Sequence, residues 1–269
     1  MTIKDWLQKS TAKLKEAGIE SPRLDSLMIV EEIYGQDRAW VLAHQENEIN
    51  PNNNKKLNNL FNQRLAHFPM AYILGRSEFY GHDFVITADV LQPRPESEAF
   101  LEILDDIVKN IDNPKLADVG TGSGALGISA GLKWPKMTID LIDIDKNALK
   151  TAKINAKKFT TPVRLIKSDL LANTDTNYDI LLCNLPYVPD DYPINRSAIH
   201  EPGLALFGGP DGLDVYRKLA SCLSESPKKP LFLLIESLAP QQRKIQEIFA
   251  PLGYKHQKTL GLVQLLKLV

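Results

Sequence analysis

The stretch LADVGTGSG at residues 116–124 indicates the fold class of this chain. Its apolar first half predicts a buried strand, and its glycines predict a tight turn into a helix. Glycines at such a turn allow positive φ angles and let the backbone approach a ligand closely. The N-terminus of the following helix offers free N–H groups to a polar or anionic ligand. The stretch therefore predicts a ligand-binding turn in an α/β domain.

The residues after this turn predict a ligand that contains adenosine. Gly122, Gly124 and Gly127 fit the pattern G-x-G-x-x-G. Asp143 follows the glycine turn by about 20 residues, the spacing expected for a carboxylate that binds ribose hydroxyls. NAD and S-adenosylmethionine both satisfy this pattern, so it does not choose between them. A tight turn without a ligand is the structural alternative.

Asp118, two residues before the first glycine of the turn, favours S-adenosylmethionine. A carboxylate at this place would face an amino group or a cation and would repel a phosphate. S-adenosylmethionine carries an amino acid and a sulfonium at that end, whereas NAD carries a pyrophosphate. An NAD-dependent oxidoreductase is thus disfavoured. The structural alternative is a carboxylate that only stabilises the turn.

Strands and helices alternate from residue 115 onward. This pattern predicts a mostly parallel sheet with helices on both faces. Helices are predicted over Lys146–Lys157 and Gln241–Phe249. The predicted strands are Leu116–Val119, Thr138–Ile142, Val163–Lys167, Tyr178–Cys183, Leu231–Ile235 and Leu262–Val269.

The N-terminal part predicts a small helical domain over residues 1–75, followed by a hairpin and the α/β domain over 76–269. Gly18 ends the first helix, and Ser21-Pro22 begins the second. The run Pro51–Asn54 predicts a loop. Aromatic and β-branched residues around Gly81 predict a hairpin. The helical domain carries no catalytic constellation, so a stability cap and a substrate-docking surface stay open.

The composition narrows the class of protein. Hydrophobic residues make up 43% of the chain and charged residues 24%, the balance of an ordinary globular protein. The net charge of −1 argues against a protein that grips long nucleic acid through its phosphates. The sequence contains no run of 18 apolar residues, so we expect no membrane span. Cys183 and Cys222 form no metal-binding cluster. We expect a cytoplasmic protein without a metal, and by default a monomer.

The segment Asn184-Leu185-Pro186-Tyr187 follows the fourth predicted strand, at the same sheet edge as the glycine turn. The Asn184 side-chain oxygen and the Leu185 carbonyl can both accept from an –NH₂ group, and Tyr187 can stack on a planar group. Two acceptors would stabilise positive charge that develops on a methylated nitrogen, as an oxyanion hole does for negative charge. The segment therefore indicates methyl transfer to a planar amide or amine, without metal or covalent enzyme intermediate. A plain turn is the alternative.

Several segments together resemble the HemK/PrmC family of release-factor glutamine methyltransferases, and the resemblance runs through most of the chain. They are more specific than the glycine turn alone. Besides residues 184–187 they are SPRLD at 21–25, RAWVL at 38–42, PMAYILG at 69–75, EFYG at 78–81, QPRPESE at 92–98 and residues 201–213.

The resemblance implies a doubly wound, seven-stranded class I methyltransferase sheet behind the helical domain. It also implies that S-adenosylmethionine is the cofactor and that a peptide-chain release factor is the partner, methylated on the glutamine of its Gly-Gly-Gln tripeptide. The candidate cofactor-binding residues are Asp118, Gly120, Thr121, Gly122, Ser123, Gly124, Asp143, Asp169, Leu170 and Asn184. The candidate catalytic residues are Asn184, Leu185, Pro186 and Tyr187.

The sequence departs from the family pattern at several places. Leu185 stands where the family usually has a second proline, which keeps the carbonyl but loses a fixed φ. Residues 258–264 lack the family's polar pattern, and Asn-Leu-Pro-Tyr also resembles ribosomal RNA adenine dimethyltransferases. Methylation of a flipped adenine in RNA or DNA is therefore the alternative function. A cofactor-binding module without catalysis is a further one.

Overall fold

The computed structural model describes residues 1–174 and 177–269. These residues form two compact units. The first contains Met1–Gly75 together with Asn195–His200, and the second contains Arg76–Ile194 and Glu201–Val269. No helix in the described part of the chain combines the length and the apolar character needed to cross a membrane.

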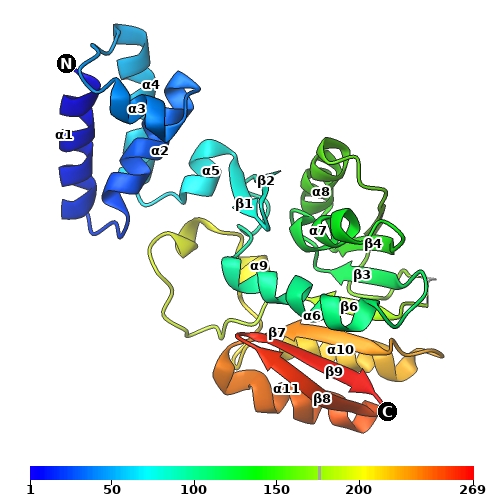
Figure 1. Cartoon of the computed structure of the whole chain (residues 1–269). Coiled ribbons are helices and arrows are strands. Elements are labelled where there is room, and N and C mark those ends of the chain that lie inside the picture. The colour runs from blue at the N-terminus through cyan, green and yellow to red at the C-terminus, as the bar shows by residue number, and fades with distance from the viewer. Residues whose placement is uncertain (175–176) are drawn as a thin grey trace. The chain divides into compact units, whose positions relative to one another are not determined.

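The first unit is a small helical bundle (Figure 1). Apolar side chains from the first four helices form its core, around Trp6, Leu14 and Phe61. Its helices are α1 (Ile3–Glu16), α2 (Pro22–Tyr34), α3 (Arg38–Ala43), α4 (Pro51–Leu65) and α5 (Met70–Leu74).

The prediction of a loop at Pro51–Asn54 is wrong, because α4 begins at Pro51. Asn50 caps the helix, since its side-chain oxygen accepts from the Asn53 N–H at 2.8 Å. Proline suits the first helical position, where its missing N–H would have no partner inside the helix. The same residue types that make a turn therefore make a helix N-terminus here.

The segment Asn195–His200 packs on the helical unit, although it lies far along the chain. The His200 ring stacks on Phe68 with 4.0 Å between ring centroids. Arg64 donates to the Ser197 hydroxyl at 3.4 Å and to the buried Asp25 carboxylate at 2.6 Å. The predicted domain boundary at residue 75 therefore does not include the segment Asn195–His200, which belongs to the helical unit.

The second unit is built on a seven-stranded sheet with strand order β5-β4-β3-β6-β7-β9-β8, as the resemblance implied. The first five strands of this order are parallel, and β9 and β8 run antiparallel. The strands are β3 (Lys115–Val119), β4 (Thr138–Asp143), β5 (Arg164–Lys167), β6 (Ile180–Cys183), β7 (Phe232–Glu236), β8 (Tyr254–Leu260) and β9 (Val263–Leu268).

One strand of the sheet, β8, was not predicted from the hydrophobic pattern of the sequence. Most of its side chains are exposed, and a register shift falls between His256 and Lys258. It lies at the edge of the sheet, paired with β9 alone. Polar residues and a bulge are usual there, so hydrophobic alternation does not mark the strand.

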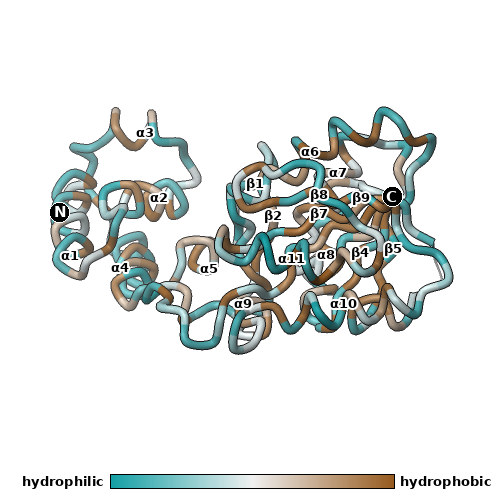
Figure 2. The backbone as a smooth tube through the Cα atoms, turned by 90° about the horizontal axis from the view of Figure 1, so that it is seen from below, coloured by the Kyte–Doolittle hydropathy of each residue, from teal (hydrophilic) through white to brown (hydrophobic). Residues whose placement is uncertain are grey.

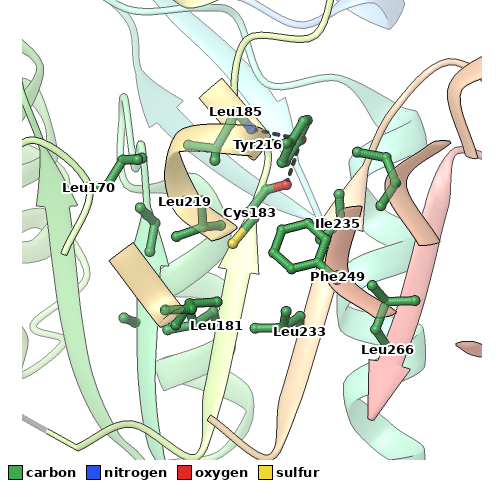
Figure 3. Close-up of a cluster of buried hydrophobic side chains, with 14 of the residues drawn as sticks. Leu170, Leu181, Cys183, Leu185, Tyr216, Leu219, Leu233, Ile235, Phe249 and Leu266 are labelled. Carbon is green, nitrogen blue, oxygen red and sulfur yellow. Dashed lines mark hydrogen bonds between the residues drawn. The ribbon is translucent and has the colours of Figure 1, made fainter. Parts of the chain in front are cut away.

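Helices cover both faces of the sheet. One face is covered by α6 (Ala99–Val108), which contacts α7 and β9, and by α7 (Ala125–Lys133) and α8 (Lys146–Lys158), which pack on β3, β4 and β5. On the other face, α10 (Asp214–Glu225) and α11 (Gln242–Phe249) bury Tyr216, Leu219 and Phe249 against the sheet (Figure 3). The hydrophobic colour concentrates in the strands between these helices (Figure 2). The remaining elements are the hairpin β1 (Arg76–Phe79) and β2 (His82–Val85), α9 (Gly203–Leu206) and the short 3-10 helices η1 (Pro95–Glu98), η2 (Ala198–His200), η3 (Ala239–Gln241) and η4 (Ala250–Leu252).

Strand alternation decides which side chains can reach the ligand turn. Ala117 and Val119 of β3 point into the core with α10 and α11. Asp118 lies between them and therefore faces the side of α7. The parallel register pairs Val119 with Cys183, so β3 and β6 end at the same level. The glycine turn and the Asn184 segment consequently leave the sheet side by side.

Candidate functional site

A cavity of about 320 Å³ lies at the carboxyl ends of β3, β4 and β6. Most predicted site residues line it. Among the described residues, Gly124 and Tyr187 are the two predicted ones that do not. The predicted residues in the lining are Asp118, Gly120, Thr121, Gly122, Ser123, Asp143, Asp169, Leu170, Asn184, Leu185 and Pro186.

Asp118 braces the glycine turn and also borders the cavity. Its Oδ2 accepts from the Thr121 hydroxyl at 2.6 Å and from the Gly127 N–H at 3.0 Å. The turn-stabilising interpretation is therefore part of its role, while the side chain still lines the cavity. Burial raises the pKa of Asp118 to about 6.

Asp143 links the end of β4 to the glycine turn. Its Oδ2 accepts from the Gly122 N–H at 2.9 Å, and its Oδ1 accepts from the Asp145 N–H at 2.8 Å. Burial raises the pKa of this carboxyl as well. Each carboxylate oxygen can accept more than one hydrogen bond, so Asp143 retains capacity for the hydroxyls of a bound ribose.

The glycine turn and the Asn184 segment approach each other so closely that Gly120 has no room for a side chain. Its φ is +70°, and a Cβ there would lie 2.9 Å from the Leu185 Cδ2. Leu185 is almost fully buried at 3% exposure. A larger residue at 120 would be strained by the positive φ and would require the buried Leu185 side chain to shift.

Asn184 is held by a chain of hydrogen bonds that leads from the cavity lining to the buried Glu236. Its Nδ2 donates to the Ser97 hydroxyl at 2.9 Å, and Ser97 donates to Glu236 Oε2 at 2.6 Å. Tyr187 donates to Glu236 Oε1 at 2.9 Å. Burial raises the pKa of Glu236, and the hydrogen bonds that it accepts from Ser97 and Tyr187 oppose that rise. The phenol of Tyr187 is thus engaged in this network.

Tyr216 fixes the backbone at the ends of β6 and β7. Its hydroxyl accepts from the Leu185 N–H at 3.3 Å and lies 3.1 Å from the Cys183 carbonyl oxygen (Figure 3). It donates to the Glu236 carbonyl at 2.5 Å. Leucine in place of proline adds one buried N–H, and Tyr216 provides its partner. The departure at Leu185 is therefore accommodated by the structure.

A second loop supports the Asn184 segment. Val188 pairs with Phe207, and the Gly208 N–H donates to the Val188 carbonyl at 2.9 Å. The Gln241 amide donates to the carbonyls of Tyr187 and Asp211 at 2.7 and 2.9 Å. These contacts explain why the segment at 201–213 accompanies residues 184–187 in the chain.

The sequence pattern assigned no role to Glu236, and it included Arg94 and Ser97 only as parts of the motif at residues 92–98. Arg94 lines the cavity and pairs with both oxygens of the buried Glu201, at 2.7 and 2.6 Å. Lys218, a further lining residue, pairs with Asp169. One signal could have found Glu236: it is a carboxylate that ends an apolar strand at the edge where ligands bind.

Two family models match this chain. The PrmC N-terminal domain matches residues 5–75, and the methyltransferase small domain matches residues 95–200. The second match contains the glycine turn and the Asn184 segment.

Relatives match over most of their length. A release factor glutamine methyltransferase of Deinococcus radiodurans is 31% identical over 82% of this chain and 80% of its own. One of Coxiella burnetii is 33% identical over 95% of this chain and 92% of its own.

Solved structures share the fold at low identity. The hMettl16 catalytic domain in complex with a MAT2A 3′UTR hairpin superposes with a TM-score of 0.56 at 13% identity, over 71% of this chain and 76% of that one. A methyltransferase from Pyrococcus furiosus superposes with a TM-score of 0.50 at 16% identity, over 79% and 95%. These two likenesses concern the fold alone.

Proposed function

This chain belongs to the release factor glutamine methyltransferase family, and from that premise we propose that it methylates the side-chain amide of the glutamine in a release factor's Gly-Gly-Gln tripeptide. The observation that carries the proposal is the Asn184 amide, whose nitrogen is held by Ser97 at 2.9 Å. Its oxygen is thereby left to accept a hydrogen bond at the cavity. A glutamine amide offers the matching donor.

The cavity suits S-adenosylmethionine, the cofactor of this family. The cofactor supplies a methyl group on a positively charged sulfur. Two buried carboxylates, Asp118 and Asp143, border the cavity, and negative charge at low local dielectric favours a cation. We assign Asp118 to the cationic amino-acid end, Asp143 to the ribose hydroxyls, and Leu170 with Asp169 to the adenine side.

Asn184 and Leu185 would act on the substrate nitrogen. The lone pair of an amide nitrogen is delocalised, so the nitrogen is a weak nucleophile. Hydrogen bonds from its two N–H groups to the Asn184 Oδ1 and the Leu185 carbonyl orient the nitrogen and stabilise the positive charge that develops on it. Tyr187 lies outside the cavity lining and bonds to Glu236, so we assign it to support of this segment.

Adenine methylation is not favoured as the alternative. The relatives described above are release factor glutamine methyltransferases. The hMettl16 domain, at 13% identity, supports only a common fold.

The direct test is mass spectrometry of an unmethylated release factor incubated with this protein and S-adenosylmethionine. We expect a gain of one methyl group on the glutamine of Gly-Gly-Gln, located by fragmentation. A release factor with that glutamine replaced by alanine is the control and should gain none. Absence of methylation, with cofactor binding shown by calorimetry, would overturn the substrate assignment and leave the fold.

The raised pKa of Asp118, about 6, predicts pH-dependent cofactor binding. Above pH 6 the carboxylate is ionised and attracts the cationic end of S-adenosylmethionine; below it the carboxyl is neutral and the attraction is lost. We expect the Kd, measured by calorimetry, to rise roughly tenfold from pH 7.5 to pH 5.

Adenosine is the control ligand for this titration, because it has the ribose but no charged end. Its Kd should change less than S-adenosylmethionine's over the same range. An equal rise for both ligands would assign the effect to Asp143 at the ribose and contradict the role given to Asp118.

Location, assembly and docking stay proposals. We propose that the enzyme acts in translation termination in the cytoplasm, as a monomer, because its substrate would be a release factor. We also propose the helical unit, residues 1–75, as a docking surface for that factor. Size-exclusion chromatography with light scattering tests whether the protein is a monomer. Loss of methylation with retained cofactor binding after deletion of residues 1–68 would support docking of the release factor on the helical unit.

A further inference from the structure

Two side chains of the cavity lining, Asn184 and Ser97, are connected by hydrogen bonds to the buried Glu236, and the three form one line. We propose that Glu236, acting through Ser97, sets the direction in which the Asn184 amide faces, so that its oxygen and not its NH₂ meets the substrate nitrogen. This inference rests on the proposed function, in which Asn184 accepts from the substrate amide.

The direction follows from what each group can donate. An ionised carboxylate only accepts, so the Ser97 hydroxyl must donate its single proton to Glu236 Oε2, at 2.6 Å. The hydroxyl oxygen is then an acceptor toward its other neighbour. Only the NH₂ side of Asn184 can donate to it, at 2.9 Å. The amide oxygen is thereby turned to the other side.

Glu236, at the end of the line away from Asn184, is also held by several hydrogen bonds. The Tyr187 phenol donates to Glu236 Oε1 at 2.9 Å, so both carboxylate oxygens have a donor. The Tyr216 hydroxyl donates to the Glu236 backbone carbonyl at 2.5 Å. Glu236 is 1% exposed and Ser97 2%, so solvent does not compete for these bonds. Hydrogen bonds in such a chain also polarise one another.

Without the carboxylate, the polarity of the line is no longer determined. A glutamine at position 236 would offer both an oxygen and an NH₂, so Ser97 could donate in either direction. An Asn184 that turns its NH₂ to the substrate would place a donor against a donor. Glu236 is therefore a positioning residue that acts through Asn184.

The first variants are Glu236→Gln, Ser97→Ala and Ser97→Thr. We expect Glu236→Gln and Ser97→Ala to lower kcat about 10- to 30-fold, with the Kd of S-adenosylmethionine changed less than twofold. Ser97→Thr keeps the hydroxyl and should retain at least half of the wild-type kcat. The double variant Ser97→Ala/Glu236→Gln should fall no more than threefold below either single one, because each breaks the same line. Multiplicative losses would overturn the proposal.

A reversal of the line is the sharper test. In the double variant Asn184→Asp/Glu236→Gln, the amide introduced at position 236 can donate to Ser97, and Ser97 can donate to one oxygen of the new carboxylate at position 184. The other oxygen of that carboxylate then faces the substrate. We expect at least tenfold higher kcat for this double variant than for Asn184→Asp alone, in which two carboxylates face each other. No recovery would contradict the polarity argument.

A measurement without substrate separates this proposal from the proposed function. In protein labelled with ¹⁵N-asparagine, the Asn184 side-chain NH₂ should exchange slowly with solvent and should shift and exchange faster in Ser97→Ala and Glu236→Gln. Unchanged signals in both variants would overturn the positioning role whatever the substrate is. Changed signals, in a protein that methylates no release factor, would refute the proposed function and retain the positioning role.

Discussion

Replacing Asn184 by alanine should lower kcat for glutamine methylation by about 10²- to 10³-fold, the range measured when one hydrogen-bonding group is removed from an oxyanion hole. The side-chain oxygen is the acceptor that the structure turns toward the cavity, because its nitrogen is held by Ser97 at 2.9 Å. Its loss acts chiefly in the transition state, where the nitrogen becomes positive. We therefore expect kcat to fall much more than KM rises.

The measurement is initial-rate transfer of labelled methyl to an unmethylated release factor, with the Kd of S-adenosylmethionine determined in parallel. Asn110→Ala is the matched control, since Asn110 is an exposed residue of the same unit that lies outside the cavity lining. It should keep wild-type kcat. A tenfold or larger loss of affinity for S-adenosylmethionine in Asn184→Ala would mean that Asn184 binds the cofactor and would contradict its assignment to the substrate.

The parts of the site that sequence could predict are those close together in the chain. Asp118 and the glycines lie within one turn, and Asn184 and Leu185 follow one strand. For such residues the strand period and the rule that parallel strands end together locate the side chains. Most of them line one cavity.

The parts that sequence reasoning missed depend on contacts between distant residues. Ser97 and Glu236 are 139 residues apart and bond at 2.6 Å. Either residue alone has the appearance of a cap or a solvated carboxylate, and only the packing of the chain around β7 shows their relation. The same reason applies to Asn195–His200, whose return to the helical unit depends on Arg64 and Phe68.

Gly212→Ala should destabilise the methyltransferase unit by about 3–5 kcal/mol, the size expected when backbone strain and steric overlap combine. Gly212 has a φ of +75°, and a Cβ there would lie 2.1 Å from the Tyr187 carbonyl oxygen and 2.5 Å from the Gln241 Nε2. The Tyr187 oxygen belongs to the backbone and moves only if the Asn184 segment moves. The Gln241 bonds to Tyr187 and Asp211 would be lost with it.

Gly261→Ala separates strain from overlap. Gly261 also has a positive φ, +58°, but a Cβ there would meet nothing within 4 Å. The left-handed conformation alone costs alanine about 1–2 kcal/mol. Urea unfolding of both variants should therefore show Gly212→Ala to be less stable than Gly261→Ala by about 1–4 kcal/mol. Equal losses of stability in the two variants would mean that the Asn184 segment and the loop that contains Gly212 move apart at little cost. A kcat of Gly212→Ala near the wild-type value would show that the Asn184 segment does not depend on contact with this loop.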